Sequence, residues 1–434
     1  MDFLEKIIVS LCILMVVPFT AGFYFVISQS FNVEPEFITA MFRKSSTTET
    51  VLKKVSPVKT ANNENLPDVI NNVSNEENNL SNPSDLIIPP KKLETPPSII
   101  NAVYVTGWSA GNKSYLNYLT NLFQTTEINA VVIDIKDYSG LISYNSGAEE
   151  VKKYNLYANA IPDINALVKF FHDQNIYVIG RISVFEDPAY SKARPDLAIY
   201  DKTKTIDPAN NPVLWLDNHN LSWLDPASKE VWDYNISLAK DAFLRGFDEI
   251  NFDYIRFPSD GKLENMGFPH WDGKTLKHFA LNNFFQYLRA SLPDEKISVD
   301  LFGQTTTSKD DMGVGQLLED SFNYFDYVSP MVYPSHYVSG FIGFSNPADH
   351  PYEVIKYSMD SALKRLVEYN NLQKTSAKFR PWVQDFNMGA HYDAEKVKLE
   401  IKALKDALGE NYNGFMLWNP SNLYTKEAVV KIQE

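Results

Sequence analysis

The hydrophobic and polar positions from residue 99 onward alternate between two patterns. Short runs rich in β-branched and aromatic residues are typical of buried strands, and the longer stretches between them place apolar residues every three or four positions, as amphipathic helices do. The stretch KEVWDYNISLAKDAFLRG (229–246) shows the second pattern, with Gly246 where a C-terminal cap is expected. The strand-like runs are residues 101–110, 129–140, 176–185, 247–258, 297–304, 327–336, 379–386 and 414–420.

These eight strand-then-helix units within residues 98–434 predict an α/β fold, a (β/α)8 TIM barrel. A doubly wound sheet is the alternative, but it would require fewer units or two domains. In a barrel the carboxyl ends of all the strands lie on one face, and active sites are built on that face. We therefore expect the polar and aromatic residues at the ends of the runs to form one pocket.

Two further segments precede the predicted barrel. Residues 7–27 carry no charge and are long enough to cross a bilayer as a helix, so we expect residues 1–44 to contain an uncleaved, single-pass transmembrane signal anchor. Cleavage near the TAG at 20–22 is the alternative. Residues 45–97 are rich in Asn, Glu, Ser and Pro, which predicts a disordered linker. The protein is thus expected to be membrane-anchored, with its barrel extracellular or periplasmic.

The composition excludes several classes of partner. The chain has 434 residues, 44% of them hydrophobic, and a formal net charge of −14, which argues against a nucleic-acid partner because phosphate binding needs a basic surface. The single cysteine, Cys12, permits no intrachain disulfide. The seven histidines do not fall at metal-ligand spacing, and the GxSxG, GxxxxGK[ST] and GxGxxG motifs are missing. We therefore expect no metal and no cofactor.

Three aspartates end predicted strands, and they are the candidate catalytic residues: Asp253, Asp300 and Asp385. Hydrolysis of a glycosidic bond needs one carboxylate at the anomeric carbon and a second carboxyl group that protonates the leaving oxygen. We expect Asp253 to be the nucleophile or stabilising group, with Arg256 close enough to pair with it or with another carboxylate. Asp300 is expected to be the acid/base, and Asp385 to bind substrate hydroxyls or stabilise the transition state. The sequence does not rank Asp300 against Asp385, and a structural ion pair is the alternative for Asp253 with Arg256.

Other side chains at or near the strand ends are expected to bind the sugar, because aromatic rings stack against sugar rings and polar groups hold their hydroxyls. Asp134 and Lys136 share one face of the second strand, which indicates a Lys–Asp pair in the pocket floor. Glu186 and Asp187, just before Pro188, are interpreted as turn residues. The expected substrate-binding residues are Trp108, Asp134, Lys136, Arg181, Tyr254, Arg256, Tyr333, His336, Trp382, Gln384, Trp418 and Asn419.

Six motifs, in chain order, resemble one known family. They are INAVVIDIKDYSG, GFDEINFDYIRFPSDG, YVSPMVYPSHY, NPADHPYEV, RPWVQDF and FMLWNP, and the resemblance covers residues 99–430. The family is that of the putative glycosyl hydrolase domains, TIM-barrel proteins that are often bacterial and exported or tethered to a membrane. The resemblance implies a glycoside hydrolase that acts on an extracellular or cell-envelope polysaccharide.

Two better-known groups of barrels help to test this implication. In α-amylase-like barrels an Asp nucleophile ends strand four, a Glu acid ends strand five and a stabilising Asp ends strand seven. Asp253, Asp300 and Asp385 resemble that layout, with Asp in place of the Glu. The chitinase-like motif of strand four is not matched, because Asn251 and Ile255 occupy two of its acidic positions. A non-catalytic carbohydrate-binding barrel, or a scaffold for another envelope protein, is the alternative to an enzyme.

Overall fold

The computed structural model describes residues 91–431. The expected transmembrane segment, residues 7–27, and residues 45–90 of the expected linker lie outside the described residues. Among residues 91–431, none of the helices combines the length and the apolar composition that a membrane span requires.

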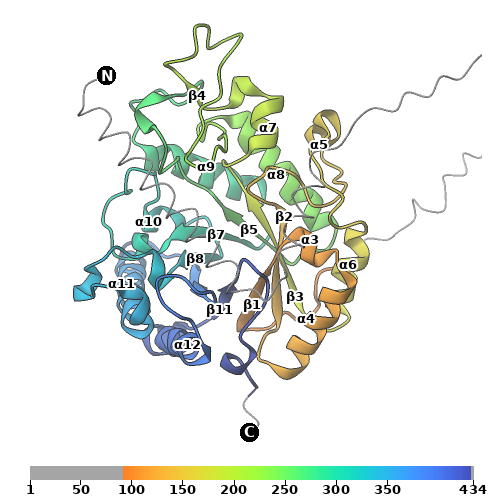
Figure 1. The fold of residues 1–434 in the computed structure, drawn as a ribbon, viewed down its shortest axis with the longest axis vertical. Coiled ribbons are helices and arrows are strands. Elements are labelled where there is room, and N and C mark those ends of the chain that lie inside the picture. Colours follow the sequence, from red (N-terminus) through yellow and green to blue (C-terminus); the bar gives the residue numbers. More distant parts are fainter. Residues whose placement is uncertain (1–90, 432–434) are drawn as a thin grey trace, which may run out of the picture. The chain divides into compact units, whose positions relative to one another are not determined.

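All eight predicted strands are present, and they form one closed parallel barrel (Figure 1). β9 and β10 are two segments of the seventh strand, since β9 pairs with β8 and β10 pairs with both β8 and β11. β1 closes the barrel by pairing with β2 and β11, which confirms the predicted TIM-barrel fold. In barrel order the strands are β1 (Ile100–Val105), β2 (Ala130–Lys136), β3 (Tyr177–Ser183), β5 (Glu249–Asp253), β7 (Ile297–Phe302), β8 (Tyr327–Met331), β9 (Lys378–Phe379), β10 (Trp382–Gln384) and β11 (Gly414–Trp418).

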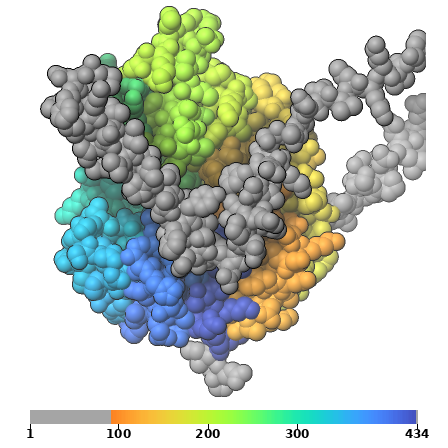
Figure 2. All heavy atoms as spheres, viewed as in Figure 1, coloured from red at the N-terminus to blue at the C-terminus, as the bar shows by residue number. Residues whose placement is uncertain are grey.

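Helices surround the strands in sequence order, and the colours in Figure 2 run round the molecule from orange through green to blue. The helices are α3 (Gly107–Ala110), α4 (Lys113–Thr125), α5 (Glu149–Tyr154), α6 (Ile164–His172), α7 (Pro188–Ala193), α8 (Lys229–Leu244), α9 (Lys277–Ser291), α10 (Leu318–Ser321), α11 (Pro351–Leu372) and α12 (Ala394–Leu408). A small antiparallel pair, β4 (Tyr200–Asp201) with β6 (Met266–Gly267), joins the long loops that follow β3 and β5. Both loops therefore lie together beside the carboxyl ends of these strands.

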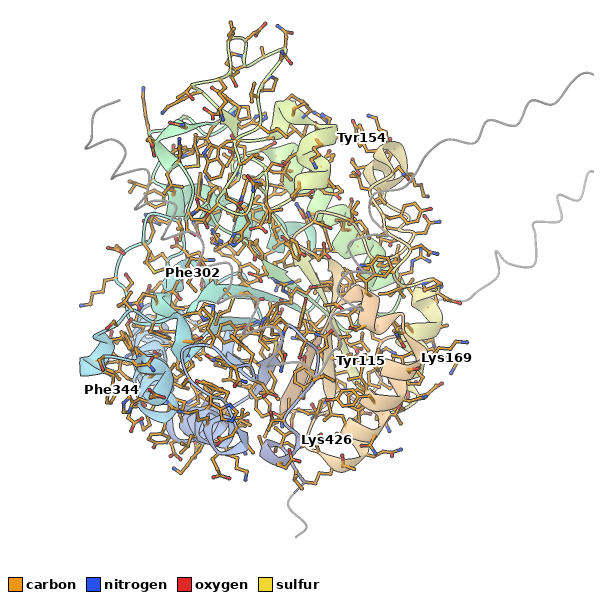
Figure 3. The ribbon with its side chains drawn as sticks, viewed as in Figure 1. Tyr115, Tyr154, Lys169, Phe302, Phe344 and Lys426 are labelled. Atoms are coloured by element: carbon orange, nitrogen blue, oxygen red, sulfur yellow. The ribbon has the colours of Figure 1, made fainter. Side chains whose placement is uncertain are left out.

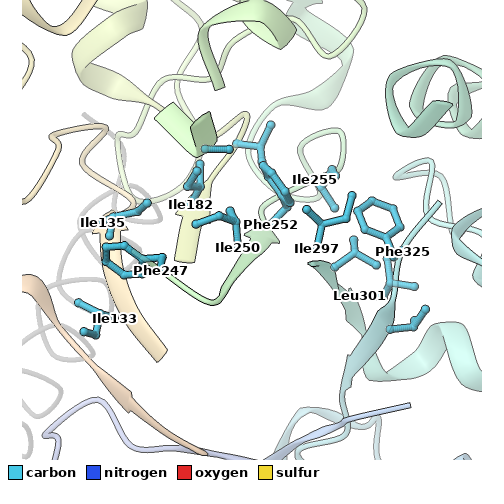
Figure 4. Close-up of a cluster of buried hydrophobic side chains, with 14 of the residues drawn as sticks. Ile133, Ile135, Ile182, Phe247, Ile250, Phe252, Ile255, Ile297, Leu301 and Phe325 are labelled. Atoms are coloured by element: carbon cyan, nitrogen blue, oxygen red, sulfur yellow. The ribbon is translucent and has the colours of Figure 1, made fainter. Parts of the chain in front are cut away.

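Alternation along the strands separates two buried layers. Outward-facing residues such as Ile133, Ile250 and Phe252 pack in the layer between strands and helices, part of which Figure 4 shows. Inward-facing residues such as Tyr177 and Trp382 belong to a separate cluster inside the barrel. The barrel interior also holds charged side chains, and these shape the site described below.

The residues just before the first strand contact the barrel. Leu93 packs against the inner cluster, and its N–H donates to Asp248 Oδ1 at 2.7 Å. Lys92 forms an ion pair with Glu295 and lies 4.4 Å from the centre of the Phe243 ring. Two residues of the segment expected to be a linker are thus held against the barrel.

Closure of the barrel depends on Gly414, where β11 approaches β1. Its φ is +99°, and a Cβ there would lie 2.0 Å from the carbonyl oxygen of Ile100. We expect Gly414→Ala to lower the free energy of unfolding by about 3 kcal/mol or more, because backbone strain adds to a contact that forces the two strands apart. Gly273, with φ +68° and nothing within 4 Å, is the matched control. Gly273→Ala should cost about 1 kcal/mol in a urea titration, and equal losses in the two variants would contradict the prediction.

Candidate active site

A cavity of about 390 Å³ lies at the carboxyl ends of the strands. Its walls come from β3, β5, β7, β8, β10, β11 and the loops that follow them, and Figure 3 labels Phe302, where β7 ends at this cavity. This is the face on which the sequence predicts a pocket. The lining residues are Arg181, Asp253, Tyr254, Arg256, Asp300, Phe302, Gly303, Gln304, Met331, Tyr333, His336, Tyr337, Trp382 and Trp418.

One buried arginine holds three carboxyl groups at the floor of this cavity. Arg181 lies opposite Asp134 on β2 and opposite Asn251 on β5 in the strand register, so its side chain points into the barrel. Its Nη1 donates to Asp134 Oδ1 at 2.6 Å, and its Nη2 donates to Asp253 Oδ2. Its Nε lies 3.9 Å from Asp300 Oδ2. A single positive charge thus faces three acids, so full ionisation of all three would leave uncompensated negative charge.

Of the three acids, Asp300 makes the longest contact with Arg181, so a negative charge on Asp300 would be the least neutralised. Its Oδ1 accepts hydrogen bonds from Asn251 Nδ2 and Trp382 Nε1, both at 2.8 Å. Its Oδ2 is buried and has no hydrogen-bond partner within residues 91–431. Burial, together with the neighbouring Asp253 carboxylate, raises the pKa of Asp300 well above its ordinary value. The raised pKa favours the protonated form of Asp300, and Oδ2 is the oxygen available for the proton.

Asp253 ends β5 and faces the cavity as the partner of Arg181, whereas the sequence predicts Arg256 as that partner. That prediction is wrong: Arg256 Nη1 donates to the carbonyl oxygen of Phe257 at 3.1 Å and to Ser259 Oγ at 3.2 Å. The physical reason is Tyr254, whose φ of +50° is left-handed and ends the strand alternation after Asp253. Such a conformation costs about 1–3 kcal/mol in a non-glycine residue and is typical of functional sites.

Aromatic rings form the wall beside this carboxyl pair. Trp418 stacks on Tyr104 with ring centres 3.9 Å apart, and it meets Trp382 edge to face at 5.5 Å. Tyr333 and His336 are in edge contact at 5.3 Å on the side of β8. Because the Nε1–H of Trp382 also holds Asp300, one ring fixes the acid and shapes the wall.

Lys136 is not paired with Asp134, and the expected Lys–Asp pair in the pocket floor is wrong. The pairing of β2 with β3 shifts register between Asp134 and Lys136, which turns Lys136 to the outer face of the barrel. Its Nζ pairs there with Asp187 Oδ2 at 2.7 Å and donates to Asn235 Oδ1 at 2.9 Å. Asp134 lies inside the barrel but does not line the cavity, and its carboxylate pairs with Arg181.

Four other predicted site residues lie away from the cavity lining. Asp385 accepts from the N–H and the hydroxyl of Thr425, at 2.8 and 2.6 Å, and holds the C-terminal loop. Gln384 accepts from Ser335, and Asn419 donates to the carbonyl oxygens of Asp385 and Leu423. The fourth residue, Trp108, lies on helix α3 rather than at a strand end and is 66% exposed. Asp385, Gln384 and Asn419 thus order loops around the site.

Glu186, which the sequence analysis interprets as a turn residue, is a buried acid outside the cavity lining. It follows β3 and is only 5% exposed, in a loop that pairs with Trp223. Burial raises its pKa to about 8, against the opposing effect of Arg256. Its neighbour Asp187 does act as a turn residue, since it caps helix α7 by accepting from the N–H of Tyr190.

The raised pKa of Glu186 predicts a pH-dependent stability. A carboxyl group whose pKa is higher in the folded state loses stability as it ionises, so this contribution to the free energy of unfolding falls as pH rises from about 4.5 to about 8. Glu186→Gln should match the wild type at pH 4.5 and become progressively more stable than it up to pH 8. Urea titrations at several pH values measure this difference. Glu410→Gln, at an exposed position, is the control, and parallel curves for Glu186→Gln and wild type would contradict the prediction.

The profile of one protein family, described as "Putative glycosyl hydrolase domain", matches residues 102–424. A comparison with curated protein sequences found no match. Among solved structures, a hypothetical protein from Ruminiclostridium thermocellum ATCC 27405 is 39% identical over 49% of this chain and 98% of its own, with a TM-score of 0.41.

Two glycosidase structures also match. The glycoside hydrolase domain of PgaB (BpsB) from Bordetella bronchiseptica has a TM-score of 0.52 and 13% identity, over 77% of this chain and 100% of its own. The α-galactosidase TtGalA from Thermus thermophilus has a TM-score of 0.44 and 14% identity, over 78% of this chain and 61% of its own. The PgaB domain supports the barrel fold and nothing finer.

Proposed function

The chain belongs to the family of putative glycosyl hydrolase domains, and from this premise we propose that it hydrolyses glycosidic bonds with Asp253 and Asp300 as its catalytic pair. The observation that carries the proposal is the pairing of two unlike acids at the floor of one cavity. Asp253 has Arg181 as its counter-charge, whereas burial and the neighbouring Asp253 raise the pKa of Asp300 and so favour its protonated form. One carboxylate and one carboxylic acid are what glycoside hydrolysis requires.

The reaction would cleave the bond between the anomeric carbon and the glycosidic oxygen. Asp300 donates its proton to that oxygen as the bond breaks, so that the leaving sugar departs as a neutral alcohol. Asp253 meets the positive charge that develops at the anomeric carbon, as nucleophile or as stabilising carboxylate. Water then supplies the hydroxyl group of the new reducing end and returns a proton to Asp300. Arg181 holds Asp253 in place throughout.

The walls of the cavity suit a sugar chain. Trp382, Trp418 and Tyr333 present flat apolar rings of the kind that stack on the C–H faces of sugars. His336 and Gln304 add polar groups at the same cavity. Asp385 is not included in the proposed catalytic set, because both of its oxygens are used by Thr425.

We further propose that the substrate is an extracellular or cell-envelope polysaccharide. The support is the uncharged apolar segment at residues 7–27, which would tether the domain outside the cell as a signal anchor. Fractionation of cells followed by protease accessibility of the barrel tests this location.

Release of reducing ends from a panel of envelope and extracellular polysaccharides, by the full-length chain, tests the activity. We expect release from at least one polysaccharide. Glycan binding without release from any of them would favour a carbohydrate-binding barrel. Association with another envelope protein, without glycan binding, would favour a scaffold.

A further inference from the structure

Arg256 differs from the other arginines of the described chain. Each of the other six in residues 91–431 forms an ion pair with an Asp or Glu; they are Arg181, Arg194, Arg245, Arg289, Arg365 and Arg380. Arg256 lines the cavity and, within the same stretch of chain, has no acidic partner at ion-pair distance. Its charge is thus available to a ligand.

The surroundings of Arg256 make an uncompensated charge costly. The side chain is 8% exposed, and its guanidinium carbon lies 4.8 Å from the ring centres of Trp223 and Phe302 and 5.4 Å from that of Tyr254. These ring faces attract the cation but replace only part of its hydration. A buried charge that lacks a partner costs several kcal/mol, so a ligand that supplies the missing anion would be bound strongly.

One edge of the guanidinium is free. Both hydrogen bonds of Arg256 leave from Nη1, to the carbonyl oxygen of Phe257 and to Ser259 Oγ. Nε and Nη2 donate to no group in the described part of the chain. These two N–H groups are parallel and match the two oxygens of a carboxylate.

The nearby acids do not occupy this edge. Glu186, Asp253 and Asp260 are the carboxyl groups that act on Arg256 from the surrounding loops and from β5. Burial raises the pKa of Glu186 to about 8, so it is neutral at pH 7. Asp253 is held by Arg181. The N–H of Asn218 donates to Asp260 Oδ1 at 3.0 Å, which holds Asp260 in its own loop.

We propose that Arg256 is an anion subsite of the cavity, and that the substrate is an acidic glycan whose sugar carboxylate, as in a uronic acid, pairs with Nε and Nη2 of Arg256. This inference rests on the proposed function of the cavity as a glycan site. It narrows the substrate class from polysaccharides in general to those with carboxylate-bearing sugars.

Binding to the full-length Asp253→Asn variant tests the inference without requiring hydrolysis. The probes are pairs of oligosaccharides: several uronate-containing oligosaccharides, and the same molecules with their carboxyl groups reduced to alcohols. Calorimetric titration should give at least about tenfold tighter binding to the acidic member of one pair, as expected for a charge-assisted bidentate contact. No preference for the acid in any pair would overturn the inference.

Variants of Arg256 assign the preference to this side chain. In the Asp253→Asn background, Arg256→Gln should abolish the preference, and Arg256→Lys should retain part of it, because the charge remains and the two-pronged edge is lost. Arg194→Gln, which removes a partly exposed arginine outside the cavity, should leave the preference unchanged. Melting temperatures check folding, and Arg256→Gln should not melt lower than its parent because it removes a charge that has no acidic partner.

Two further outcomes separate this inference from the proposed function. Hydrolysis of uronate-containing glycans with the same kcat/KM in wild type and Arg256→Gln would overturn the anion subsite while leaving the hydrolase intact. Selective binding of acidic probes without hydrolysis of the parent polysaccharides would support the subsite and count against the hydrolase. Tighter binding of sulfated than of uronate oligosaccharides, lost in Arg256→Gln, would overturn the assignment to a carboxylate.

Discussion

Asp253→Asn is expected to lower kcat for glycan hydrolysis by about 10³-fold or more. The carboxylate of Asp253 meets the charge that forms at the anomeric carbon, and an amide of the same shape brings no charge to that position. Asparagine keeps an oxygen that can accept from Arg181, so the barrel interior should stay packed. Reducing-end release under single-turnover conditions measures the loss.

Asp248→Asn is the matched control for this substitution. Asp248 lies immediately before β5, at the opposite end of the same strand, and is buried where it accepts from His172 and from the N–H of Val178. Its replacement should lower stability but leave kcat within a few fold of wild type. Equal losses of kcat in the two variants would indicate that both act through the fold, and the catalytic assignment of Asp253 would then fail.

The barrel was predictable from the sequence because its strands are unbroken apolar runs and its helices bury every third or fourth residue. Each strand-like run lies at a strand of the structure, since a strand buried on both faces needs unbroken runs of β-branched and aromatic residues. The ends of the runs were less well predicted. Residues 107–110 form helix α3 rather than a strand end, which removes Trp108 from the pocket. Over so few residues, the hydrophobic pattern is the same for the end of a strand and for a helical turn that begins directly after it.

The site was predictable only as far as strand alternation holds. Asp253 and Asp300 lie on neighbouring strands in matched register, so both carboxyl groups reach the same cavity, as expected for residues at strand ends. Lys136 and Arg256 each follow a break in alternation, a register shift in one case and the left-handed Tyr254 in the other. Such breaks are not visible in the pattern of hydrophobic and polar residues. As a result, each of these two charged side chains contacts groups that the sequence did not predict.

Ion-pair partners were the other feature that the sequence could not supply. Arg181 was expected to bind substrate, and in the structure it organises three acids that come from β2, β5 and β7. These acids are far apart in the chain and meet only because the barrel closes. Burial inside the closed barrel and the neighbouring Asp253 carboxylate raise the pKa of Asp300, and both depend on this closure. The difference between Asp253 and Asp300 is therefore a property of the folded barrel and not of either local motif.

Asp300→Asn is expected to lower kcat for natural glycans by about 10²–10⁴-fold, the usual contribution of a general acid. Asparagine can keep Trp382 and Asn251 in place through its amide oxygen, but the NH2 group that replaces Oδ2 has no acidic proton to transfer. The loss should be much smaller for a 2,4-dinitrophenyl glycoside, because that leaving group departs without protonation. Comparison of kcat for natural and activated substrates therefore separates an acid from a residue that only maintains the fold.

The pH profile provides a second check of the same assignment. The active form of Asp300 is protonated, so wild-type kcat should fall as pH rises through its raised pKa, and this descending limb should be missing in Asp300→Asn. Asp385→Asn tests the rival arrangement, in which the acid lies on strand seven. Because Asp385 is held by Thr425 outside the cavity lining, kcat of this variant should stay within about tenfold of wild type. The loss of a general acid would lower kcat by more than that. A descending limb that persists in Asp300→Asn and disappears in Asp385→Asn would transfer the role of acid to Asp385.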